Sequence, residues 1–162
     1  MNDGARTAGP NVGAVDAGQP APTVQTTHLA DGPTVVSERW EGAHSVSVGV
    51  WVGVGSRDEP AARAGASHFL EHLLFKGTER RSARSIAELV DGSGGEMNAA
   101  TGKEFTAFYA RLPAGGQDLA VDLLGDVLCG PALRAADVET ERRVILEELH
   151  LQEDDPSDVV AS

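Results

Sequence analysis

The chain is 162 residues long, which is enough for one domain with a sizeable hydrophobic core. Its 25 acidic residues against 13 Lys and Arg residues give a formal net charge of −12. This balance leaves no basic stripe that could neutralise phosphates, so it argues against a nucleic-acid partner.

The sequence has no membrane span, no secretory signal and no pair of cysteines, and these features bear on where the protein is expected to reside. No apolar run approaches the roughly 20 residues of a membrane span, and no basic segment followed by an apolar one marks a secretory signal. The single cysteine, Cys129, permits no internal disulfide. Because it ends a helical apolar pattern, we expect Cys129 to be a buried structural thiol. The sequence therefore predicts a soluble, cytoplasmic protein without a membrane partner.

The N-terminal segment, residues 1–25, consists mostly of small and polar residues with hardly a large apolar side chain. Such a segment buries too little surface to offset the entropy of ordering it, so it is predicted to be a flexible tail. Residues 26–162 are predicted to form one domain. Its first element is a hairpin, because the turn signal at residues 31–33 separates Thr26–Leu29 from Thr34–Trp40.

A strict period of two predicts a strand over residues 45–55, with valine on one face and mostly Ser and Gly on the other. The small residues would allow another element to approach closely. The next segment, about Ala62–Phe75, is apolar nearly all round, which predicts a buried helix.

The second half of the sequence predicts two strands and three helices. Ser85 and Glu88 fit a capping box at the start of the first helix. In chain order we expect a short helix over about Ser85–Val90, strands over Glu96–Thr101 and Lys103–Leu112, a helix between Gly116 and Gly130, and a charged helix over about Ala135–Glu153. Hairpin strands followed by helices favour an α+β fold, with helices on one face of a mostly antiparallel sheet.

The helix over residues 62–75 contains the sequence His68-Phe69-Leu70-Glu71-His72. Residues four apart on a helix lie on one face, with Cβ atoms about 5–6 Å apart. Two imidazoles so placed can reach one Zn²⁺ at about 2.0–2.1 Å each. Glu71 can flank the same metal without being a ligand and could take a proton from metal-activated water. The H-x-x-E-H pattern is typical of a zinc peptidase.

A catalytic zinc is held by three protein ligands and keeps one open position, so two histidines need a third partner. At about 100° per residue, the apolar face of the last predicted helix is centred on two carboxylates. Glu141 and Glu148 fall in the middle of this face, and Glu147 lies at its edge. The apolar residues of the face are Val138, Val144, Ile145, Leu149 and Leu151.

A carboxylate on an apolar face is costly to bury unless it is paired or bound to metal. One interpretation is that Glu141 and Glu148 meet Arg side chains or water at a seam between helices. The other is that Glu148 is the third zinc ligand and Glu141 is a supporting or alternative carboxylate. The H-x-x-E-H sequence favours the second interpretation.

Taken together, these residues resemble the N-terminal portion of the pitrilysin-type (M16) zinc peptidases, also called inverzincins. This family includes the mitochondrial processing peptidase β subunit and its bacterial homologues. Seventy-five residues lie between His72 and Glu148, as expected of the family's distal glutamate. The other matching segments are residues 73–78, 94–99, 141–148 and 153–156.

The resemblance implies peptide hydrolysis at one Zn²⁺ per chain, with His68, His72 and Glu148 as its ligands. Glu71 would act as the general base, because zinc lowers the pKa of a bound water to about 7. Glu141, seven residues before Glu148, matches the family's upstream glutamate.

The resemblance also implies where a substrate binds. In family members the substrate peptide pairs as an added strand with a sheet edge beside the metal. By similarity this edge would be the strand of Asn98 and Ala99. Asn98 equally fits a turn or strand-end residue that satisfies backbone groups.

Family chains are much longer, with two related halves that close over the substrate, and this chain ends within the first half. We therefore expect residues 26–162 to be a truncated N-terminal zinc-binding peptidase domain. The leading hypothesis is a zinc-dependent endopeptidase of peptides or unfolded polypeptides, with a companion chain supplying the second half. The alternative is a non-catalytic zinc- or peptide-binding fragment or partner subunit of a split peptidase. Intact site residues favour catalysis, and the short length favours the alternative.

Overall fold

The computed structural model describes residues 23–30 and 32–153, which fall into two compact units divided after Ala43. The first unit contains the predicted hairpin, formed by β1 (Thr23–His28) and β2 (Thr34–Arg39). The two strands are antiparallel and pair from Thr23 with Arg39 to His28 with Thr34. Pairing with β2 makes Thr23–Gln25 strand rather than tail, and the rest of the predicted tail lies outside the described residues.

The second unit is built on a three-stranded antiparallel sheet in the order β3-β5-β4. Its strands are β3 (Ser45–Val52), β4 (Glu96–Thr101) and β5 (Thr106–Pro113). The strand predicted over residues 45–55 is confirmed as far as Val52, but of its valines only Val46 and Val48 are partly buried, and Val50 and Val52 are exposed. There the strand ends, because the chain turns back on itself with a hydrogen bond from the Val54 N–H to the Val52 carbonyl.

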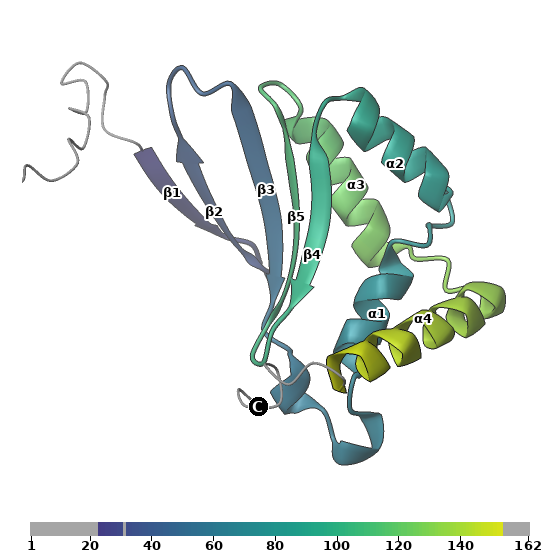
Figure 1. The fold of residues 1–162 in the computed structure, drawn as a ribbon. Helices are drawn as coiled ribbons and strands as arrows, with labels where there is room; N and C mark the ends of the chain where they lie inside the picture. The colour runs from purple at the N-terminus through teal and green to yellow at the C-terminus, as the bar shows by residue number, and fades with distance from the viewer. Residues whose placement is uncertain (1–22, 31, 154–162) are drawn as a thin grey trace, which may run out of the picture. The chain divides into compact units, whose positions relative to one another are not determined.

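The four α-helices of the described chain lie on one side of this sheet, with α4 packed against α1 (Figure 1). They are α1 (Ala66–Leu74), α2 (Ala83–Gly92), α3 (Gln117–Cys129) and α4 (Ala135–Glu153), and two short 3₁₀ helices, Ser56–Asp58 and Ala61–Arg63, precede α1. The α+β architecture predicted from the sequence is thereby confirmed. Within the described residues, no helix combines the length and apolarity needed to cross a membrane.

The hydrophobic core lies between the central strand β5 and α3. Alternate residues of β5 point toward the helices, and α3 presents one apolar stripe to them. The buried cluster consists of Phe108, Ala110, Leu112, Ala120 and Leu124, with Val46, Val48, Leu74, Phe75, Met97 and Ala99 among the residues packed around it. The sheet thus gives α1 a fixed platform, because the C-terminal end of α1 packs on this core.

Helix α1 is shorter and more exposed than predicted. It begins at Ala66 because Gly65 adopts the left-handed conformation (φ 87°), which interrupts the helical path expected from Ala62 onward. Leu73 is the one residue of α1 that is fully buried, and Leu70 is half exposed. The apolar residues of the helix were therefore wrongly predicted to be buried on all sides.

Two local predictions on other helices are also wrong. The N-cap of α2 is Ser82, whose Oγ accepts from the Ser85 N–H at 3.1 Å, so the cap lies three residues before the predicted one. Glu88 instead pairs with Arg84, one turn away. Cys129 is exposed, because it lies two residues, or about 200°, beyond the buried Val127 on α3.

The core placement of α3 predicts the effect of two substitutions on the same helix. Leu124 is 1% exposed, so Leu124→Ala should lower the free energy of unfolding by about 2–5 kcal/mol through the cavity it leaves. Val121 is 59% exposed, and Val121→Ala should change the free energy by about 0.5 kcal/mol or less. Urea unfolding measures both. Equal losses would contradict the packing of α3 on β5.

Candidate metal centre

Helices α1 and α4 bring three potential metal ligands together. His68 and His72 lie one turn apart on α1, and their Nε2 atoms are 3.1 Å from each other. Glu148 of α4 places Oε2 3.9 Å from the His68 Nε2 and 3.7 Å from the His72 Nε2. Among the residues that the structure describes, this is the one group of three or more His, Cys, Asp or Glu side chains whose ligand atoms lie within 4.8 Å of one another.

The donor set and its spacing fit zinc. Bonds of about 2.0–2.2 Å in a tetrahedral arrangement place neighbouring ligand atoms about 3.3–3.5 Å apart. The observed separations of 3.1 to 3.9 Å bracket this value. The side chains of His68, His72 and Glu148 are 39%, 21% and 42% exposed, so the group opens to solvent on one side. Two imidazoles and one carboxylate with an open position are what a catalytic zinc requires.

Glu141 lies behind His72, away from the other two ligands. Its Oε2 is 3.3 Å from the His72 Nδ1, and its Oε1 is 2.7 Å from the Lys76 Nζ. A proton on Nδ1 directed at this carboxylate leaves the Nε2 lone pair free to bind a metal. Glu141 is only 2% exposed, so it forms a buried link between α4 and α1. It meets a histidine and a lysine rather than the Arg of the simpler interpretation.

Among the side chains of α4 that the structure describes, the line of contact with α1 is narrower than predicted; Leu149 and Leu151 of the predicted apolar face lie outside them. Glu141 and Ile145 are buried on it, Glu148 is half buried, and Glu147 is exposed. Val144 was wrongly placed on the inner face: it is exposed, because α4 packs through the residues spaced i, i+4 and i+7 along this single line. A helical wheel gives the direction of each side chain, but it does not show how much of that helix face the partner helix covers.

Glu71 lies on α1 between the two histidines but outside the group of three. The Thr101 hydroxyl, at the end of β4, donates a hydrogen bond to the Glu71 Oε2. Asn98 and Ala99 lie two to three residues earlier on the same strand. Within the described part of the second unit, β4 is an edge strand. The Asn98 Oδ1 accepts from the Ala99 N–H at 2.9 Å, and Asn98 is exposed.

The start of α1 is held by a carboxylate that the sequence analysis missed. Both oxygens of Glu59 accept backbone hydrogen bonds, from the Gly65 N–H and the Ser67 N–H, each at 2.6 Å. Hydrogen bonds from Ser67, followed by that from Gly65, lower the pKa of Glu59. The carboxylate serves as an N-terminal cap from six to eight residues away. Capping patterns that can be recognised in a sequence span about three residues, so this cap could not be predicted.

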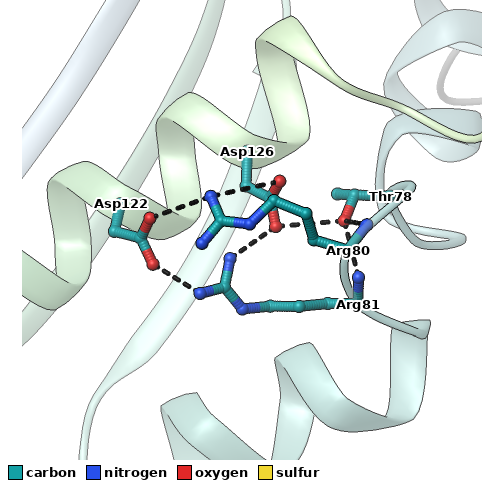
Figure 2. A network of polar contacts seen from close by, with 5 residues as sticks. All are labelled: Thr78, Arg80, Arg81, Asp122 and Asp126. Carbon is teal, nitrogen blue, oxygen red and sulfur yellow. Dashed lines mark hydrogen bonds and ion pairs between the residues drawn. The ribbon is translucent and has the colours of Figure 1, made fainter.

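The chain leaving α1 is anchored by a network of charged side chains (Figure 2). The buried Thr78 hydroxyl donates to the Asp126 Oδ2 at 3.0 Å and accepts from the backbone N–H groups of Arg80 and Arg81. The Arg81 guanidinium bridges Asp122 and Asp126, which lie one turn apart on α3. Its hydrogen bond to Asp126 is the main cause that raises the pKa of Arg81.

The same segment also fixes where α4 begins. The Glu79 N–H donates to the Gly130 carbonyl at 3.0 Å, and the Ala132 N–H donates to the Gly77 carbonyl at 3.0 Å. Gly77 has a φ of 115°, and a Cβ there would lie 2.9 Å from the Arg81 carbonyl oxygen, so glycine is required. The exit of α1 and the approach to α4 are therefore joined, which sets the position of Glu148 relative to the two histidines.

Comparison with known proteins identifies the family. The model of the family described as "Insulinase (Peptidase family M16)" matches residues 34–162. The chain belongs to this family of peptidases. The resemblance drawn from the sequence motifs is thus confirmed.

The similar proteins of known name are proteases. An uncharacterized zinc protease of Mycobacterium tuberculosis is 55% identical over 135 residues, covering 83% of this chain and 31% of the relative. A probable mitochondrial-processing peptidase subunit beta of Arabidopsis thaliana is 38% identical, covering 86% of this chain and 26% of the relative. The crystal structure of a protease from Helicobacter pylori superposes with a TM-score of 0.80 at 28% identity, covering 85% of this chain and 33% of that one. The chain therefore spans between about a quarter and a third of the length of these relatives.

The network beside α1 predicts a pH dependence of stability. Burial raises the pKa of Asp122, but hydrogen bonds from Arg80 and Arg81 outweigh this and hold the pKa below the ordinary value of 3.8. Stability from a lowered carboxyl pKa is present above the unfolded-state value and is lost as the pH falls through the folded-state value. The thermal midpoint of Asp122→Asn should therefore lie below that of the wild type near neutral pH, and the two should converge below pH 3.8.

Thermal unfolding at a series of pH values measures this convergence. Asp91→Asn, which removes an exposed carboxylate of α2 outside the network, tests whether the loss of any one charge has the same effect. A gap between wild type and Asp122→Asn that persists unchanged to low pH would contradict the assignment.

Proposed function

We propose that the chain carries the metal centre of a zinc-dependent endopeptidase. In this proposal His68, His72 and Glu148 hold one Zn²⁺ per chain, and Glu71 is the general base. The observation that supports it most is the meeting of three ligand atoms from α1 and α4 at separations that suit a tetrahedral zinc. Membership of a peptidase family and the similarity to zinc proteases support the same reaction class.

The protein residues around this centre have separate tasks. When bound, zinc would lower the pKa of a water to about 7 and polarise the carbonyl oxygen of the substrate. Glu71 accepts the proton from the attacking water and passes it to the leaving amine. The Thr101 hydroxyl bonds one carboxylate oxygen of Glu71, which restricts the side chain and leaves Oε1 for the proton. Glu141 holds His72 with its Nε2 toward the metal.

The substrate is proposed to be a peptide or an unfolded polypeptide that adds a strand to the edge of β4. Strand addition requires an extended backbone, which a folded protein rarely offers. Asn98 and Ala99 would supply the pairing groups, and Asn98 must first release the Ala99 N–H that its own side chain engages. Thr101, two residues beyond Ala99, bonds the base, so pairing along β4 would place the peptide beside Glu71.

A companion chain is proposed to complete the enzyme, because the chain spans 31% of the length of its Mycobacterium relatives. The alternative is that the chain binds zinc or peptide without catalysing hydrolysis by itself. Peptide cleavage should be assayed for this chain alone and after addition of the remaining part of such a relative as a separate polypeptide. Cleavage by the mixture but by neither part alone would support the split arrangement. Zinc binding without cleavage in either case would support the alternative.

The ligand assignment predicts an order of zinc affinities. Purified wild-type protein should contain close to one zinc per chain by elemental analysis, and His68→Ala should lose it. Glu148→Gln should weaken zinc binding by more than the roughly 10–100-fold typical of residues that support a ligand. Glu147→Gln is the matched control, because Glu147 is exposed on the same helix. The reverse order for these two variants would shift the ligand by one residue, and a metal-free wild type would end the zinc proposal.

The assignment of the base predicts a variant that separates binding from catalysis. Glu71→Gln changes a proton acceptor and leaves all three ligands in place. In whichever assembly is active, it should lower kcat by roughly 10²–10⁴-fold while zinc content stays at the wild-type level. Cleavage at the wild-type rate would mean that another group is the base.

A further inference from the structure

A lysine that none of the preceding assignments uses lies next to the metal centre. Lys76 follows the last residue of α1 by two positions and His72 by four. Its Nζ is 2.7 Å from the Glu141 Oε1, while the other oxygen of the same carboxylate is 3.3 Å from the His72 Nδ1. The Lys76 side chain is 40% exposed, and that of Glu141 is 3% exposed. Lysine, carboxylate and imidazole thus form a chain that runs from solvent to the metal-facing ring.

The buried carboxylate is paired with this lysine. A carboxylate removed from water is costly unless a partner of opposite charge compensates it. Within the described residues, the Glu141 carboxylate forms ion pairs with Lys76 and His72, and a histidine that binds a metal through Nε2 is not a cation. The neighbouring arginines of α4, Arg142 and Arg143, contact Glu139 instead of Glu141.

The two oxygens of Glu141 also have different partners, which fixes the direction of the carboxylate. With Oε1 held by the ammonium group, Oε2 stays directed at the His72 Nδ1. Lys76 and Glu141 together are neutral, and the negative member is the one that contacts the histidine. The pair therefore does not repel a cation at Nε2, although an isolated lysine at this position would.

We propose that Lys76 is a positioning residue of the metal centre, which acts through Glu141 to hold the His72 ring in its metal-binding orientation. This inference rests on the proposed zinc site. It concerns zinc affinity and therefore does not require the chain to be active alone. Removing the ammonium group should leave the Glu141 Oε1 without its partner, so that the carboxylate is free to turn away from His72. His72 then loses the acceptor that sets its tautomer.

The sequence provides a matched control, because it contains two lysines, Lys76 and Lys103. Lys103 is exposed in the turn between β4 and β5 and forms no ion pair within the described residues. Zinc dissociation constants should be measured by competition with a chromophoric chelator. Lys76→Met should weaken binding by roughly 10–100-fold, the range typical of partners that orient a ligand. Lys76→Arg should restore most of it, and Lys103→Met should bind as the wild type does.

A double-mutant cycle tests whether Lys76 acts through Glu141. If it does, Lys76→Met should weaken zinc binding in the wild type but add little once Glu141→Gln is present. A general effect of charge or of folding would give additive losses instead. The thermal midpoint of each metal-free variant is recorded alongside. If metal-free Lys76→Met is not folded, Lys76→Gln, which keeps a polar head without charge, takes its place in the cycle.

The outcomes separate this inference from the proposed function. A wild type that binds zinc together with Lys76→Met that binds it equally well, or more tightly, overturns the role of Lys76 alone. Additive losses in the cycle overturn it as well. A wild type that binds no zinc overturns both the zinc site and this inference. A non-additive loss with rescue by Lys76→Arg supports it.

Discussion

The proposed metal centre depends on one buried carboxylate, that of Glu141, at the contact between α1 and α4. Its two oxygens contact His72 of α1 and Lys76, two residues beyond the end of α1, so a single side chain of α4 both orients a proposed ligand and attaches its own helix. A buried carboxylate is stable only while such partners are present. The position of Glu148, two turns further along α4, follows from this attachment. A change that frees Glu141 should therefore disturb the centre without touching any of the three ligands.

Three further constraints position α1, and one of them also positions the chain that leads into α4. The segment after α1 is bound to α3 by the network around Thr78 and Asp126, and it pairs with the chain that leads into α4 (Figure 2). At the other end of α1, Glu59 caps the first turn. The core between β5 and α3 supports the C-terminal end of the helix. The two proposed histidine ligands thus come from a helix that is held at its start, at its end and along one side, which favours a preorganised centre.

The chain covers about a third of the length of its zinc-protease relatives, yet all the residues proposed for the metal centre lie within it. The proposed base is bonded to the end of β4, and the edge of this strand is open within the described second unit. Metal chemistry and strand addition would therefore meet at one place on a small scaffold. The relatives have a further two thirds of chain that could contribute to substrate binding. Zinc binding is a separate question, because the proposed ligands all lie within this chain.

The sequence alone determined what depends on local periodicity: the strand at residues 45–52, the helix α4, and the placing of His68 and His72 on one helical face. It also singled out Glu148, because a carboxylate repeated every seven residues on an apolar face is conspicuous in a helical wheel. Only the tertiary structure decided which partners those groups meet. Thr101 on Glu71 joins residues 30 apart in the chain, and Lys76 on Glu141 joins residues 65 apart. Contacts of this kind depend on how helices pack on a sheet, and no pattern of neighbouring residues encodes that packing.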